Sequence, residues 1–80
     1  MTDSVNAYSL IQTEVGSAAS VAQEISKLQG VTLAEDVTGP YDVIVRAEAQ
    51  SMDELGRLVV ARVQGVAGIT RTLTCPVVHL

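Results

Sequence analysis

Hydrophobic positions along the chain follow two spacings, one typical of strands and one typical of helices. Segments with β-branched, aromatic or alternating apolar residues predict strands at residues 5–13, 31–37, 41–49 and 69–78. Apolar residues three and four apart predict amphipathic helices at residues 18–28 and 51–64. The predicted order is therefore β-α-β-β-α-β.

The predicted helices carry capping signals. Ser51 and Glu54 form a capping box, in which the hydroxyl and the carboxylate each accept from a free backbone amide. Gly30 is expected to end the first helix in the left-handed conformation, and Gly65 to repeat that role for the second. Both glycines lie in a repeated triplet, Gln29-Gly30-Val31 and Gln64-Gly65-Val66. Two copies of a short repeat indicate a pseudo-symmetric domain rather than a solenoid.

The same spacings assign side chains to faces. In the second helix, the residues expected to be buried are Met52, Leu55, Leu58, Val59 and Val63, and those expected to be exposed are Arg57 and Gln64. In the second strand, one face is expected to hold Val31, Leu33 and Val37. In the last strand, Ile69, Leu73, Cys75 and Val77 are expected to share one face, opposite Thr70, Thr72 and Thr74.

Right-handed crossovers place both helices on one face of a four-stranded antiparallel sheet, which is the α+β, ferredoxin-like βαββαβ fold. The helices are expected to cover Val43, Val45, Ala47, Ile69 and Leu73. The uncovered face is expected to carry Ile44, Arg46, the three threonines of the last strand, and from the first strand either Tyr8 and Leu10 or Ala7, Ser9 and Ile11.

This uncovered face has few charges, whereas a solvated sheet face shows polar residues at alternate positions. A patch of roughly several hundred Å² is large for a monomer surface. We therefore expect a homodimer in which two sheets pack face to face about a two-fold axis. The alternative is a monomer with a wet, threonine-rich sheet.

Composition narrows the class of protein. Eighty residues, 48% hydrophobic and 18% charged, indicate one globular domain. The apolar runs are too short for a membrane helix, and the N-terminus lacks the pattern of a secretory signal. One cysteine, Cys75, excludes an internal disulfide and fits the cytoplasm. A net charge of −4, with no Trp or Phe, argues against direct nucleic-acid binding.

The segment from Asp36 to Arg46, Thr38-Gly39-Pro40-Tyr41-Asp42 included, resembles the effector-binding domain of the Lrp/AsnC (feast/famine) transcription regulators, together with Gly65-Val66 and Thr70-Arg71-Thr72. The resemblance extends from about residue 5 to residue 78. It implies a dimeric α/β barrel, octamer or decamer rings of dimers, and an amino acid or similar metabolite bound between dimers. Full-length members carry a helix-turn-helix, and only a few residues precede the first strand here. The chain therefore resembles the stand-alone modules, with residues 1–80 as a single ligand-binding domain that modulates a full-length regulator by co-assembly.

The resemblance also implies a ligand site. Its residues are Gly39, Tyr41, Asp42, Thr72 and Thr74. Gly39 lets the backbone approach a ligand, and the amides of Tyr41 and Asp42 can donate to a carboxylate. The Asp42 carboxylate can accept from an ammonium group, and the two threonines supply a polar rim. Pro40 departs from the family pattern and removes a donor. In the alternative interpretation Gly39-Pro40 is only a turn and Asp42 pairs with Arg46.

The sequence offers few residues that could carry out enzyme chemistry. His79 is the sole histidine, beside the C-terminus, and along a strand it lies roughly 13 Å from Cys75, too far to share a metal ion. We expect no catalytic residue, metal or cofactor. The alternatives are a small dimeric α+β-barrel enzyme of the monooxygenase or isomerase kind, an ACT-like amino-acid sensor that binds near Gly16, and a structural oligomerisation module.

Overall fold

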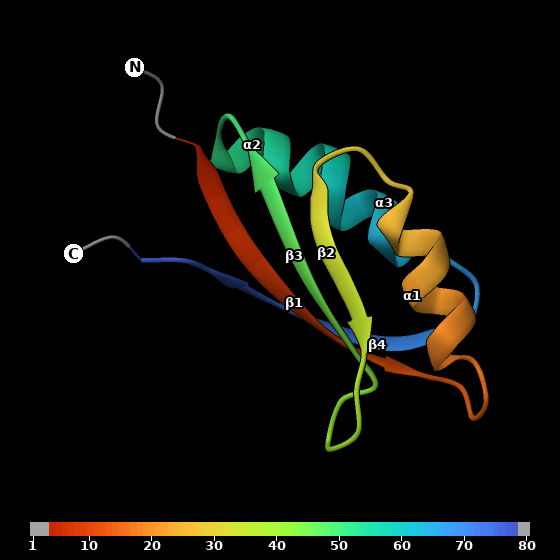
Figure 1. Ribbon diagram of the computed structural model, residues 1–80. Helices are drawn as coiled ribbons and strands as arrows, with labels where there is room; N and C mark the ends of the chain where they lie inside the picture. Colours follow the sequence, from red (N-terminus) through yellow and green to blue (C-terminus); the bar gives the residue numbers. More distant parts are fainter. Residues whose placement is uncertain (1–3, 79–80) are drawn as a thin grey trace.

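A computed structural model describes residues 4–78 of the chain. The elements in order are β1 (Val5–Thr13), α1 (Ala18–Ser26), β2 (Val31–Asp36), β3 (Val43–Ala49), α2 (Met52–Glu54), η1 (Leu55–Val60), α3 (Ala61–Gln64) and β4 (Ile69–Pro76). The strands form one antiparallel sheet in the order β2-β3-β1-β4, and both helical segments cover the same face of it (Figure 1). The predicted ferredoxin-like fold is confirmed, and β1 has its predicted bounds.

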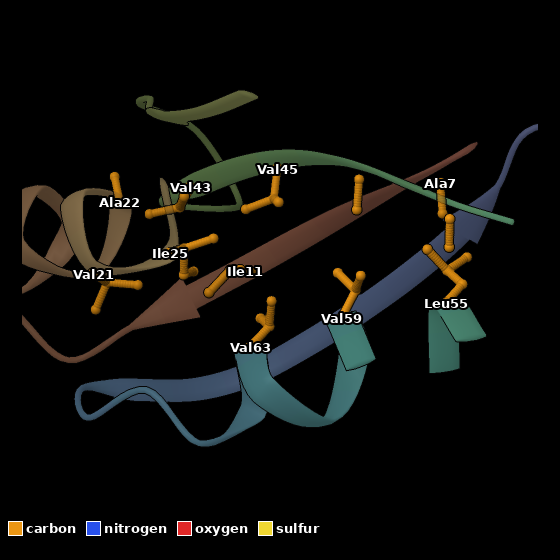
Figure 2. Packing of buried hydrophobic residues seen from close by; sticks show 12 residues of the cluster. Ala7, Ile11, Val21, Ala22, Ile25, Val43, Val45, Leu55, Val59 and Val63 are labelled. Atoms are coloured by element: carbon orange, nitrogen blue, oxygen red, sulfur yellow. The ribbon is translucent and has the colours of Figure 1, made fainter. Parts of the chain in front are cut away.

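The core lies between that face of the sheet and the helices (Figure 2). β1 and β3 contribute alternate residues to it, among them Ile11, Val43 and Val45, which are fully buried. α1 contributes Val21 and Ile25. Each side chain of this size stabilises the fold by about 1.5–3 kcal/mol when it is fully buried.

The second helical segment is continuous from Met52 to Gln64, but its middle, η1, is a π-helix. Leu55, Val59 and Val63 are buried, lie four positions apart and point toward the sheet (Figure 2). In an α-helix, four residues overshoot one turn by about 40°, so this spacing would drift away from the core. The wider i→i+5 turn, seen where the Ala61 N–H donates to the Gly56 carbonyl, reduces that drift.

One prediction for this helix is wrong. Met52 is 53% exposed rather than buried, because it is the first helical residue and lies outside the line of Leu55, Val59 and Val63. The capping box is confirmed: the Ser51 hydroxyl accepts from the Glu54 N–H at 3.1 Å, and the Glu54 carboxylate accepts from the Gln50 N–H at 3.4 Å. Arg57 and Gln64 are exposed as predicted, and the Leu58 side chain lies outside the described part.

Each edge strand contains a β-bulge near its start. In β2 the partners change from Val31↔Ala47 to Leu33↔Arg46, and in β4 from Ile69↔Thr13 to Arg71↔Gln12. One residue of each edge strand, Thr32 or Thr70, is therefore extra. An extra residue exchanges the two faces for everything that follows it.

The bulges overturn three predicted face assignments. Leu33 does not share the face of Val31, and Leu73 and Cys75 do not share the face of Ile69: all three lie on the uncovered face, opposite Arg46, Leu10 and Tyr8. Thr72 and Thr74 pair with Ile11 and Ser9, which are buried on the helix side. The predicted threonine row on the uncovered face is therefore wrong. The same register shows that β1 contributes Tyr8 and Leu10 to that face.

The bulges also reveal the repeat that the structure uses. Gly30-Val31-Thr32 and Gly68-Ile69-Thr70 each consist of a glycine with positive φ (93° and 96°), a residue packed on the core, and the bulged threonine. Gly65 has a right-handed φ of −81°, so its predicted equivalence with Gly30 is wrong. Gly30 itself does not end α1, which stops at Ser26, but closes the following turn where β2 begins.

Candidate functional site

The loop that joins β2 to β3 carries three of the predicted ligand residues and projects beyond the end of the sheet (Figure 1). Gly39 has a φ of 140°, which side chains rarely adopt. Hydrogen bonds hold the loop: the Gln12 side-chain amide donates to the Pro40 carbonyl at 3.0 Å, and the Val37 N–H donates to the Asp42 carbonyl at 2.8 Å. The chain bends at Thr38, Gly39 and Pro40, as both interpretations of the sequence require.

Asp42 ties this loop to the end of β1. Its Oδ2 accepts from the Thr13 N–H at 2.8 Å, and its own N–H donates to the Ile11 carbonyl at 2.8 Å. The predicted alternative, in which Asp42 pairs with Arg46, is wrong, because the Arg46 guanidinium lies over the Tyr8 ring instead, 5.9 Å from its centroid. The Asp42 amide is also committed to Ile11, so it is not the open ligand donor that was predicted.

Thr72 and Thr74 lie on β4, on the other side of β1 from Asp42. The Thr74 hydroxyl is 3.4 Å from the Ser9 hydroxyl. Thr72 lines a shallow hollow of about 250 Å³ with Gln64, Ile69, Thr70 and Arg71. The predicted residues therefore form two groups, one on each side of residues 11–13, and not one closed pocket.

Sequence reasoning did not include Arg71 in the site. Arg71 lines the same hollow as Thr72, and an arginine guanidinium is a cation that pairs with carboxylates. The available signal was that Arg71 interrupts an otherwise apolar alternation along the last strand.

A second hollow, of about 320 Å³, lies at the opposite end of β3 and contains none of the predicted ligand residues. Its walls come from Ser4, the segment Gln29–Thr32, the segment Glu48–Gln50, Glu54 and Val59. Gly30 fits there because it has no side chain: a Cβ at this position would lie 2.9 Å from Val59 Cγ2 and 3.1 Å from the Glu48 carbonyl oxygen.

The uncovered face of the sheet, called here the open face, is formed by two central cross-strand rows. The first row is Leu33, Arg46, Tyr8 and Cys75, and the second is Glu35, Ile44, Leu10 and Leu73. Tyr8, Leu33 and Leu73 are 38–40% exposed. Because Leu73 and Cys75 stand in these rows in place of the predicted threonines, the centre of this face is more apolar than the sequence suggested.

Two other kinds of feature concern the described residues: metal sites and membrane-spanning helices. Within residues 4–78, no group of three His, Cys, Asp or Glu side chains is placed to hold a metal ion, and no helix has the length and apolar character needed to cross a bilayer. His79 lies outside the described residues.

Comparison with known proteins shows a match to a protein family and to several relatives. Residues 6–79 match the Lrp/AsnC ligand binding domain. An uncharacterized HTH-type transcriptional regulator of Pyrococcus furiosus is 30% identical over 54 residues, which cover 68% of this chain and 36% of that protein. The chain thus spans about a third of the length of this relative. A homocitrate synthase of Sulfurisphaera tokodaii is 31% identical over 55 residues, which cover 69% of this chain and 12% of the enzyme.

Solved structures share the fold. A protein of Thermus thermophilus has a TM-score of 0.86 at 25% identity, with 95% of both chains covered. Escherichia coli AsnC has a TM-score of 0.84 at 23% identity, covering 95% of this chain and 52% of that one. A Neisseria meningitidis transcriptional regulator, solved as a complex with L-Met, has a TM-score of 0.78 at 17% identity, covering 94% and 50%.

The family match defines a ligand-binding domain and favours it over the enzyme alternative, and the shared fold agrees with this class. The chain belongs to the Lrp/AsnC ligand binding domain family.

Proposed function

We propose that this domain is an amino-acid-responsive oligomerisation module of the cytoplasm, in which two copies pack their open faces together. The observation that carries the proposal is the pair of cross-strand rows, which set Tyr8, Leu10 and Ile44 side by side on a face that no helix covers. Burying this apolar surface favours association. A domain of 80 residues also has a small core, so association adds stability that the monomer lacks.

The ligand proposed is an α-amino acid or a similar small metabolite, held at the Asp42 end of the sheet. Hydrogen bonds among the described residues use one carboxylate oxygen of Asp42, and the other is free to accept from an ammonium group. Arg71, beside Thr72, supplies a cation for the ligand carboxylate. Gly39, Tyr41 and Thr74 complete the proposed set.

Because Asp42 and Thr72 stand on opposite sides of β1 in one copy, we place the ligand where a neighbouring dimer closes the hollow. Octamer or decamer rings of dimers would provide such contacts, and so would co-assembly with a full-length regulator of the same family. A ligand shifts such assemblies only if it binds one association state more tightly than the other. The L-Met complex of the Neisseria meningitidis regulator supports an amino acid as the ligand class.

Sedimentation and calorimetry with a panel of amino acids test the proposal. We expect a dimer or larger assembly without ligand, and heat and a change in mass with at least one amino acid. Asp42→Asn keeps an oxygen acceptor for the Thr13 N–H but removes the charge, so this variant should stay folded and lose binding. Asp53→Asn, at an exposed aspartate in α2, is the matched control and should bind normally.

Two outcomes contradict parts of the proposal. Absence of heat with every amino acid would leave a structural oligomerisation module as the better account. Unchanged affinity in Asp42→Asn would remove that carboxylate from the site.

A further inference from the structure

Arg46 is the one charged side chain in the first row of the open face, between Tyr8 and Leu33. Its Nε is shielded from solvent and has no hydrogen-bond partner among residues 4–78. A buried N–H without an acceptor is unfavourable, and native structures satisfy nearly all such groups. If a second copy covers the open face, the rest of the guanidinium is buried as well, and the cost of leaving it unpaired rises. Arg46 therefore needs an acceptor that residues 4–78 of its own chain do not provide.

The charges of the open face indicate where that acceptor comes from. Two carboxylates share the face, Glu35 opposite Ile44 and Glu48 opposite Asn6, and neither forms an ion pair with Arg46 within the described chain. The strands place two cations, Arg46 and Arg71, and two anions on this face, so that it is neutral although the chain carries −4. A neutral face with both signs can pair with a copy of itself, whereas the acidic remainder of the surface repels a copy.

We propose that Arg46 forms an ion pair with Glu35 of the partner subunit, and by symmetry Glu35 with Arg46 of the partner subunit. This proposal rests on the proposed dimer. The ion pair is the contact that fixes how the two sheets are placed against each other. In an isologous interface, the two-fold axis lies between the sheets and exchanges residues across a line drawn on the face.

Positions on the sheet favour Glu35 over Glu48. Glu35 lies one strand and one row away from Arg46, so the line that exchanges them passes near Ile44 and Leu10, at the apolar centre. Exchange with Glu48, two residues farther along the same strand, moves the line to the height of Ala47 and leaves Ile44 and Leu10 uncovered. Only the arrangement with Glu35 both buries the apolar residues and gives Arg46 an ion-pair partner. The ring of Tyr8, against the guanidinium, holds Arg46 in place for this contact.

Charge reversal in the full chain tests the pair, with the dimer dissociation constant measured by sedimentation equilibrium. Arg46→Glu and Glu35→Arg should each raise that constant at least about tenfold, because like charges then face each other. The double variant, Arg46→Glu with Glu35→Arg, should return to within about threefold of the parent. The matched control, Arg46→Glu with Glu48→Arg, carries the same net charge and should stay weak.

The outcomes separate this pair from the proposed function. A monomeric parent chain overturns both. A dimeric parent overturns the pair alone if the single variants dimerise normally, if the Glu35 swap does not recover, or if the Glu48 swap recovers instead. Far-UV circular dichroism of each variant shows whether it is folded, and recovery in the double variant shows that both substitutions are tolerated.

Discussion

At the scale of single residues, a position can require glycine for its positive φ alone, or also because a side chain would not fit. Gly16 has a φ of 82° and open space around it, whereas Gly30 has a φ of 93° and faces Val59 and the Glu48 carbonyl. We expect Gly16→Ala to lower the free energy of unfolding by about 1 kcal/mol, the cost of a left-handed alanine. Gly30→Ala should lower it by about 3 kcal/mol, because its Cβ also displaces Val59.

Urea denaturation of both variants at one protein concentration measures the difference. Equal losses would show that Val59 moves aside freely, and that Gly30 is needed only for its φ.

The predicted ligand residues show what a sequence can and cannot reveal at this scale. The turn at Gly39 and the acidic residue after it are local features, so they could be predicted. The partner of Asp42, the Thr13 N–H, is 29 residues away and depends on how the loop meets β1. Arg46 could be placed on the uncovered face, but its position over Tyr8 rather than beside Asp42 depends on strand order.

At the scale of elements, the two helical segments offer a matched test of capping. Both have serine at the N-cap, but only the Ser51 side chain accepts from the helix, at the Glu54 N–H, whereas Ser17 makes no side-chain cap bond. Ser51→Ala should therefore lower the free energy of unfolding by about 1 kcal/mol. Ser17→Ala should change it by less than about 0.5 kcal/mol. Thermal denaturation of the two variants checks this, and a loss in Ser17→Ala as large as in Ser51→Ala would contradict the assignment.

The elements themselves could be predicted because each one depends on local spacing, and this is why their order and most bounds are confirmed. The bulges could not be predicted by counting alternate positions, since one extra residue reverses every face that follows. Leu33, Leu73 and Cys75 were misplaced for this one reason. The signal that was available is the sequence glycine, β-branched residue, threonine, which occurs at Gly30-Val31-Thr32 and Gly68-Ile69-Thr70 and was obscured by the more obvious Gln-Gly-Val triplet.

At the scale of the whole molecule, the side chains that the bulges place on the open face favour association of two copies. Thr72 and Thr74, which would have suited water, lie on the helix side, and Leu73 and Cys75 take their places on the open face. The edges of the sheet are less suited to pairing with another chain, because both edge strands are bulged and β4 contains Pro76. Packing of faces, rather than addition of strands, is therefore the mode of association that the architecture favours.

Ile44 tests this conclusion, since it lies beside Leu10 at the centre of the open face. Ile44→Val and Ile44→Thr leave side chains of nearly the same size. They differ in that threonine has a hydroxyl where valine has a methyl group. On a solvated sheet face the two variants should be equally stable within about 0.5 kcal/mol. In a two-fold dimer, the hydroxyl is buried twice, at about 1 kcal/mol each, so Ile44→Thr should dissociate about thirtyfold more readily than Ile44→Val. Sedimentation equilibrium of the two variants decides the matter: equal dissociation constants would mean that Ile44 stays in water and that the copies meet through another surface.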